Sequence, residues 1–178
     1  YSKDLHSAAE ERNTLEQDLR DAISNGTLDL HYQPVVDANS NVIAGFEALL
    51  RWKHPTRGWL SPQKFVPIAE DTGLITAIGD WAIRTACDDL AKWPRNIRCA
   101  VNVSPLQFAN PQLPSTITNA IARTGIHPSR LELEITESVF RNDDEGTEAE
   151  ATGGFCTAAH ATAPPPAVVD VLAAFFSF

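Results

Sequence analysis

The stretch that decides how this chain folds is GFEALLRW, residues 45–52. It overlaps a mostly apolar run over residues 42–50, and a run of this kind predicts a strand buried on both faces. Glu47 adds a carboxylate to the run, and Arg51 adds a permanent positive charge four positions later. Because a carboxylate can hold a metal ion and a guanidinium can bind a phosphate through paired donors, the stretch predicts a phosphate-handling site on a strand.

The segments around this stretch alternate between strand and helix patterns. Strands are expected at residues 28–33, 98–103 and 131–136, with Pro34 ending the first of them. Helices are expected at residues 4–24, 61–71, 74–93 and 111–124, and residues 54–58 are expected to form a loop. This alternation predicts an α/β fold with largely parallel strands, and it does not distinguish an open sheet from a barrel.

Composition narrows the class of protein. A chain of 178 residues can form one compact domain, and its net charge of −9 argues against binding to a nucleic acid polymer. Its three cysteines, Cys87, Cys99 and Cys156, form no CxxC pair and are expected to be reduced and mostly buried. The start of the chain has no signal-peptide pattern, and the apolar run at 167–178 is too short to span a bilayer. We therefore expect a cytoplasmic domain, and a membrane anchor in a longer parent protein stays open.

The sequence divides into three parts. Residues 1–26 form a linker or first helix, which either connects to a preceding domain or packs on its own domain. Residues 27–150 carry the alternating strands and helices. Residues 151–178 contain no Lys, Arg or Glu and only one Asp, and they show neither a helical stripe nor strand alternation until the apolar end. We interpret Tyr1 as a fragment boundary, because the sequence contains no Met.

Four of the expected strands carry a polar side chain toward the carboxyl end, namely Gln33, Glu47, Asn102 and Glu134. In α/β proteins the carboxyl ends of the strands gather on one rim, so these side chains are expected to meet. A buried carboxylate is costly unless it is paired or bound to a metal. Two carboxylates and an amide oxygen suit a hard cation, and we therefore expect Mg²⁺ or Mn²⁺.

Each of these residues also has a plainer interpretation. Glu132 and Glu134 suit the solvated face of an edge strand, Asn102 suits a turn, and Gln33 suits an exposed strand position. The five histidines show no metal-binding spacing, so a histidine centre has no support from the sequence. The recurrence at equivalent strand positions favours a common site over four unrelated residues.

Several motifs occur together in a consistent order. They are Tyr32-Gln33-Pro34, residues 46–52, residues 65–70, Val101-Asn102-Val103-Ser104 and Glu134-Ile135-Thr136-Glu137. With these motifs the chain resembles the EAL domain family, the bacterial cyclic di-GMP phosphodiesterases, from about Glu11 to Asp144. The first helix resembles the linker that joins a GGDEF domain to an EAL domain.

The resemblance implies a modified TIM barrel in which the first strand runs against the others. It implies a two-metal site, with Mg²⁺ or Mn²⁺, that hydrolyses cyclic di-GMP to linear pGpG. Matching the motifs residue by residue implies metal ligands, substrate contacts and a loop-steadying glutamate near a dimer surface. The implied metal ligands are Glu47, Asn102 and Glu134, and the implied substrate contacts are Gln33, Leu50 and Arg51. The loop-steadying glutamate is Glu137. Glu47 and Glu137 are the expected catalytic residues. A homodimer and an upstream GGDEF or sensory domain are the expected protein partners.

The family pattern breaks off after the fourth strand. The family next carries an Asp-Asp-Phe-Gly-Thr-Gly motif and then a catalytic Lys, a further Glu and a Gln, and residues 151–178 supply none of these. A TIM barrel needs about 200 residues or more, so we expect an incomplete copy with impaired or absent hydrolysis. The alternatives are a non-catalytic cyclic di-GMP receptor or docking module, and a chain without function by itself. A shifted reading frame or a junction would explain the unmatched tail.

Overall fold

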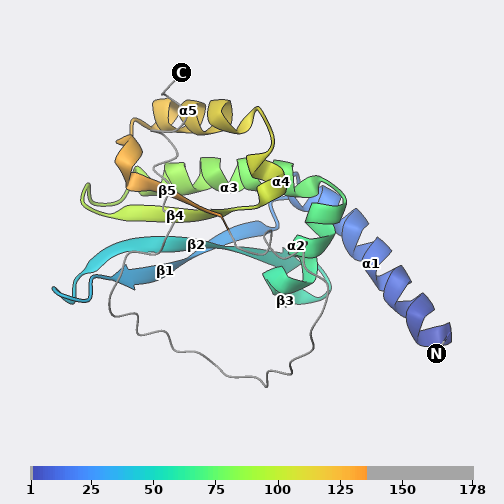
Figure 1. Cartoon of the computed structure of the whole chain (residues 1–178). Coiled ribbons are helices and arrows are strands. Elements are labelled where there is room, and N and C mark those ends of the chain that lie inside the picture. Colours follow the sequence, from blue (N-terminus) through green and yellow to red (C-terminus); the bar gives the residue numbers. More distant parts are fainter. Residues whose placement is uncertain (1, 136–178) are drawn as a thin grey trace, which may run out of the picture.

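The computed structural model describes residues 2–135, with the side chains of residues 10–135 (Figure 1). The helices are α1 (Ser2–Ala22), α2 (Pro62–Asp71), α3 (Leu74–Leu90), α4 (Pro105–Phe108), α5 (Leu113–Thr124) and the 3-10 helix η1 (Pro128–Arg130). The strands are β1 (Leu28–Val36), β2 (Ile43–His54), β3 (Gly58–Leu60), β4 (Arg98–Val103) and β5 (Leu131–Ile135). Glu137 and the segment 136–178 lie outside the described residues.

The strands form one mixed sheet in the order β1-β2-β4-β5, with β3 paired to β2. The β2–β4 and β4–β5 pairs are parallel, whereas β1 and β3 run antiparallel to β2. The α/β prediction is therefore confirmed, and the first strand runs against the parallel strands as the resemblance implies. Over the part of the chain that is described, the sheet is open and not closed into a barrel.

Three strand boundaries differ from the sequence-based expectation. β1 continues through Pro34 to Val36, so the prediction that Pro34 ends the strand is wrong. Within the described sheet β1 pairs only with β2, and such an edge strand tolerates a residue without an N–H. β2 extends to His54, because its last residues pair with the short strand β3. The sequence predicts no strand there and assigns Gly58 to a loop. Gly58, at φ 71°, supplies the positive φ that the tight connection requires.

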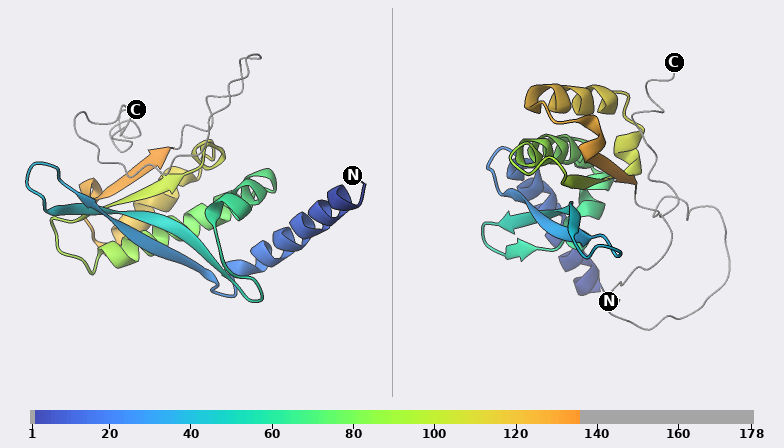
Figure 2. Two further views of the ribbon diagram at one scale, coloured as in Figure 1. Left: turned by 90° about the horizontal axis from the view of Figure 1, so that it is seen from below. Right: turned by 90° about the vertical axis from the view of Figure 1, so that its left-hand side faces the viewer.

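The sheet has one face covered by helices. The two hydrophobic clusters on this face take even-numbered residues of β1 and β2, such as Leu30 and Trp52, and odd-numbered residues of β4 and β5, such as Val101 and Leu133. The largest fully buried side chains there are those of Trp52 and Phe65. Figures 1 and 2 show α3 and α5 on the same side of the strands, and α3 packs against β4. No described helix lies on the opposite face, which we call the open face.

Helix α1 is joined to the body through the end of β2. His54 is only 4% exposed, and its Nε2 lies 2.9 Å from Asp18 Oδ2. The other ring nitrogen, Nδ1, accepts the backbone N–H groups of Thr56 and Arg57. Leu19 of α1 is fully buried, so the C-terminal half of the helix packs on the domain, while Figure 1 shows its N-terminal end projecting away. This geometry accommodates both roles expected for the first helix.

No described helix is long and apolar enough to cross a membrane.

Two of the three cysteines can be placed. Cys87 and Cys99 are free and buried, as expected. Burial raises the thiol pKa of Cys87 to about 11 and that of Cys99 to about 12. Both therefore stay protonated and unreactive near neutral pH. Cys156 lies outside the described residues.

The close approach of β2 and β4 at Gly45 leads to a stability prediction. A Cβ atom at Gly45 would lie 2.9 Å from the backbone oxygen of Arg98, so Gly45→Ala forces the two paired strands apart. We expect this substitution to lower the free energy of unfolding by about 1–3 kcal/mol. Urea denaturation followed by circular dichroism measures the change, and an unaltered midpoint would contradict the close strand contact.

Candidate functional site

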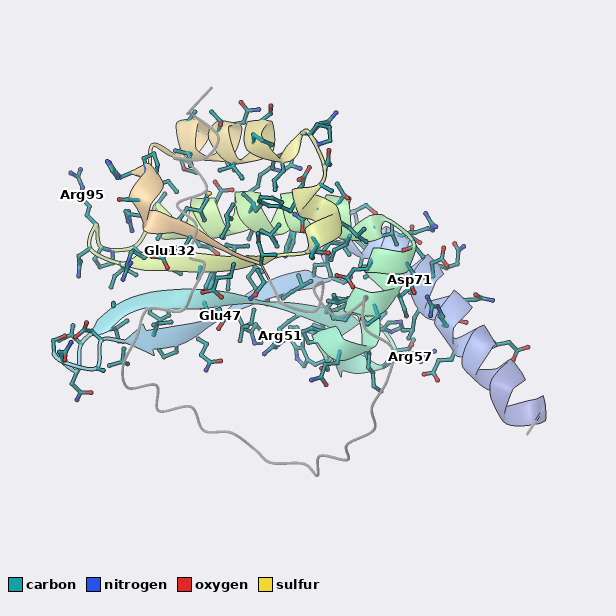
Figure 3. The ribbon with its side chains drawn as sticks, viewed as in Figure 1. Glu47, Arg51, Arg57, Asp71, Arg95 and Glu132 are labelled. Carbon is teal, nitrogen blue, oxygen red and sulfur yellow. The ribbon has the colours of Figure 1, made fainter. Side chains whose placement is uncertain are left out.

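The candidate site lies on the open face. In β2 the odd-numbered residues Glu47 and Arg51 point to this face, and Figure 3 shows both along the strand. Gln33 of β1 stands directly opposite Glu47 in the antiparallel register, and it is exposed. Neighbouring residues in register have their side chains on the same face, so three of the expected site residues share one surface.

Two further expected residues join Glu47 from the parallel strands. Asn102 of β4 donates a hydrogen bond from Nδ2 to Glu47 Oε1 at 2.8 Å. Glu134 of β5 is in register with Asn102 and lies on the same face. The structure therefore brings together Glu47, Asn102 and Glu134, the three residues expected to hold a metal.

The electrostatics of this group show an excess of negative charge. Partial burial raises the pKa of the Glu134 carboxyl above its usual value, and the charges of Glu47 and Glu132 raise it further. The neighbouring Glu132 is different, because its Oε1 pairs with Arg98 Nη1 at 2.6 Å. No ion pair to Glu47 or Glu134 is present among residues 10–135. A cation next to these carboxylates would relieve the repulsion between them.

The two expected substrate contacts on β2 point in opposite directions. Arg51 lies on the open face, where Nη1 donates to the backbone oxygen of Leu50 at 2.9 Å and no carboxylate of the described chain pairs with it. Leu50 is an even-numbered residue of β2, so its side chain points to the helix-covered face and contacts both hydrophobic clusters. A ligand on the open face would therefore meet Leu50 only through its main chain.

The oxygen ligands that this site offers suit a hard cation, but they are few. Carboxylate and amide oxygens are the ligands that Mg²⁺ and Mn²⁺ prefer. Within the described part of the chain, however, no group of three or more His, Cys, Asp or Glu is arranged to hold a metal ion. Glu47 and Glu134 are two carboxylates, and Asn102 adds one amide.

Two interactions near the site were not expected from the sequence. Ser104, directly after β4, donates from Oγ to Glu70 Oε1 at 2.8 Å and ties α2 to the end of the strand that carries Asn102. Trp59 of β3 packs edge-on against His31 of β1, with 5.2 Å between ring centroids, on the open face. Glu70 belongs to the family motif at residues 65–70, so the sequence could have indicated a role for it. The position of Trp59 beside His31 depends on the pairing of β3 and could not be predicted from the sequence.

Comparison with known proteins gives one family and several relatives. Residues 16–152 match the family described as "EAL domain". The chain is 48% identical over 143 residues to an uncharacterized signaling protein of Caulobacter vibrioides. It is 40% identical over 151 residues to the bifunctional diguanylate cyclase/cyclic di-GMP phosphodiesterase MucR of Pseudomonas aeruginosa.

Solved structures agree with this family. A structure of the PaMucR phosphodiesterase in complex with c-di-GMP matches at a TM-score of 0.69 and 44% identity, over 73% of this chain and 54% of that one. The FimX EAL domain of Xanthomonas citri, in complex with c-diGMP, matches at a TM-score of 0.65 and 30% identity, over 75% and 53%. The chain spans about half of each solved EAL chain, and it covers 18% of the Caulobacter relative and 22% of MucR.

The raised pKa of Glu134 predicts a pH-dependent stability. The folded chain keeps this proton to a higher pH than the unfolded chain does. The contribution of protonated Glu134 to the stability of the fold is therefore fully present below the usual glutamate pKa. This contribution is lost as the pH rises through the raised pKa of the folded chain. In EDTA at pH 8 we expect Glu134→Gln to increase the free energy of unfolding by about 0.5 kcal/mol, with no gain at pH 4.

Glu132→Gln on the same strand and face is the matched control for this measurement. Its carboxylate is paired with Arg98, so we expect no stabilisation at pH 8. Urea titrations at several pH values measure both variants. A stabilisation by Glu134→Gln that is equal at pH 4 and pH 8 would contradict the electrostatic origin.

Proposed function

This chain belongs to the EAL domain family, and we propose that its open face is part of a metal-dependent cyclic di-GMP phosphodiesterase site. The observation that carries the proposal is the meeting of Glu47, Asn102 and Glu134 from three different strands on one surface. Arg51 lies on the same surface without a carboxylate partner among the described residues, as a phosphate-binding guanidinium requires. Relatives that are named or solved as cyclic di-GMP proteins support the choice of nucleotide.

The residues fit a divalent cation by their chemistry. Glu47 and Glu134 offer anionic oxygens, and partial burial together with the charges of Glu47 and Glu132 raises the pKa of Glu134. Asn102 would offer its amide oxygen while its Nδ2 orients Glu47. When bound, Mg²⁺ or Mn²⁺ would supply an activated water and charge neutralisation for phosphodiester hydrolysis.

The other residues would bind and orient the substrate. Arg51, on the same strand as Glu47, would hold a phosphate of the nucleotide by bidentate hydrogen bonds. Gln33, opposite Glu47, would contact the substrate from β1. Leu50 would act through its backbone and fix the strand in the core, and Glu137, outside the described residues, would steady a loop beside the site.

A closed TIM-like barrel is part of this proposal. The described strands form an open sheet with β5 at one edge, and the chain covers about half of the solved EAL chains. Further strands would continue the sheet from β5, cover the open face and bring additional carboxylates. An upstream GGDEF or sensory domain would attach at the N-terminal end of α1, in the cytoplasm, and a homodimer is the expected assembly.

Binding without hydrolysis is the second candidate function. It is favoured by the small number of ligands, because among residues 10–135 no group of three or more His, Cys, Asp or Glu could hold a metal ion. The tail at 151–178 adds only one acidic residue, Asp170. The described residues would keep Arg51 and Gln33 for nucleotide contact, while Glu47, Asn102 and Glu134 would hold one cation.

Titration of the 178-residue chain with cyclic di-GMP in Mg²⁺ tests this proposal. We expect saturable binding by calorimetry and little or no pGpG by chromatography. Arg51→Ala should weaken binding at least about tenfold, because it removes a charge-assisted contact to phosphate. Arg84→Ala, a change at an exposed arginine of α3, is the matched control and should leave the affinity unchanged.

The outcomes separate the candidates. Rapid Mg²⁺-dependent formation of pGpG would support the enzyme and contradict the incomplete site. Binding with little or no turnover would support an incomplete site that holds the nucleotide without hydrolysing it. Absence of binding, or binding that Arg51→Ala does not affect, would contradict the placement of the nucleotide on the open face.

A further inference from the structure

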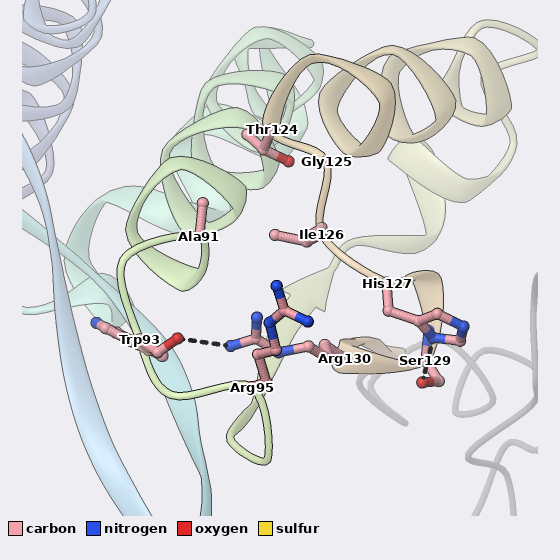
Figure 4. Close-up of a pocket in the computed structure, with 9 residues that line it drawn as sticks. All are labelled: Ala91, Trp93, Arg95, Thr124, Gly125, Ile126, His127, Ser129 and Arg130. Atoms are coloured by element: carbon pink, nitrogen blue, oxygen red, sulfur yellow. Dashed lines mark hydrogen bonds between the residues drawn. The ribbon is translucent and has the colours of Figure 1, made fainter.

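A second concave site lies at the opposite end of the strands from Glu134 and Asn102. The pocket has a volume of about 510 Å³ and is formed where α3 ends, α5 ends and η1 leads into β5. Figure 4 shows its lining, which consists of Ala91, Trp93, Arg95, Thr124, Gly125, Ile126, His127, Ser129 and Arg130. Pockets of about 300–1,000 Å³ accommodate organic ligands, so this one exceeds the size of a single ion.

Arg130 gives the pocket a buried positive charge. Its side chain is only 9% exposed. Nε donates to Ile97 O at 2.9 Å, and Nη2 donates to Leu90 O at 3.0 Å and Pro94 O at 2.9 Å. These carbonyls lie at and just beyond the C-terminus of α3, where a positive charge is stabilised. The guanidinium is therefore held rigidly by neutral acceptors, and no carboxylate of the described chain neutralises it.

The remaining donors are directed to the pocket. A guanidinium has five N–H donors, and Nη1 of Arg130 has no hydrogen-bond partner among the described residues. Arg95 and Arg130 both line the pocket, as Figure 4 shows, and no ion pair involves Arg95 in the described part of the chain. Two guanidinium groups in one pocket repel each other unless an anion lies between them.

The turn that carries Arg130 adds polar groups suited to the same ligand. His127 Nδ1 lies 2.7 Å from Ser129 Oγ and accepts the Ser129 N–H, which leaves Nε2 of the ring for another contact. No Asp or Glu is among the lining residues, in a chain whose net charge is −9. Ala91 and Ile126 form an apolar patch on the wall. The pocket thus combines cationic donors on one side with a small apolar surface.

We propose that this pocket binds a phosphate monoester, with the phosphoryl group between Arg95 and Arg130 and the organic group against Ala91 and Ile126. Planar guanidinium forks match phosphate oxygens in pairs, and rigid burial of Arg130 lowers the entropy cost of forming them. The volume assigns the ligand to an ester and not to inorganic phosphate. The site is separate from the open face, so it does not depend on the proposed hydrolysis of cyclic di-GMP.

Calorimetric titration of the full chain with phenyl phosphate, in EDTA and without divalent cations, tests this site. We expect one saturable site, with inorganic phosphate binding about tenfold or more weakly. Arg95→Ala should reduce the affinity for phenyl phosphate at least about tenfold, because it removes a charge-assisted phosphate contact. Arg95 is exposed and makes no ion pair with the described chain, so its removal should leave the unfolding midpoint unchanged.

Arg20→Ala, a change at an exposed arginine of α1, is the control for the loss of a surface positive charge, and it should bind phenyl phosphate as the parent chain does. Loss of binding in Arg20→Ala, or full binding in Arg95→Ala, would overturn the proposal. Equal affinities for inorganic phosphate and phenyl phosphate would overturn the assignment to an ester. A titration without saturable binding would overturn the site altogether.

Discussion

The hydrogen bond from Asn102 Nδ2 to Glu47 Oε1 is the contact on which the candidate site depends. It joins β2 to β4 across 55 positions of sequence and fixes the orientation of a carboxylate on the open face. Glu134 then comes from β5 in register with Asn102, and its pKa rises because a half-buried carboxylate lies near another one. The group stores electrostatic repulsion that a bound cation would relieve.

The helix-covered face makes this arrangement possible. Trp52 and Leu50 pack on the helices from the same strand that presents Glu47 and Arg51 to the open face. Because successive side chains of a strand alternate between faces, core packing on one side determines which polar groups meet on the other. The contact between His54 and Asp18 connects the end of β2 to α1, so a displacement of that helix would shift the end of the strand.

The sequence predicted most elements because their signals are local. The helices at 62–71 and 74–90 and the strand at 98–103 occur where hydrophobic periodicity, Pro62 and Gly73 placed them, within three residues at each end. The expectations that failed depended on pairing. Pro34 remains in a strand because β1 is at an edge, and β3 exists only because the end of β2 offers a partner.

The sequence by itself determined the family and predicted the candidate site residues, since motif order and residue type do not depend on coordinates. The tertiary structure decided which of those residues share a surface. It placed Gln33, Glu47, Arg51, Asn102 and Glu134 on the open face and turned Leu50 into the core. It alone created the pocket of Arg95 and Arg130, because the ends of α3 and α5, at Leu90 and Thr124, meet only when the layers pack. Periodicity is a property of a segment, whereas strand register and helix packing are properties of the whole sheet.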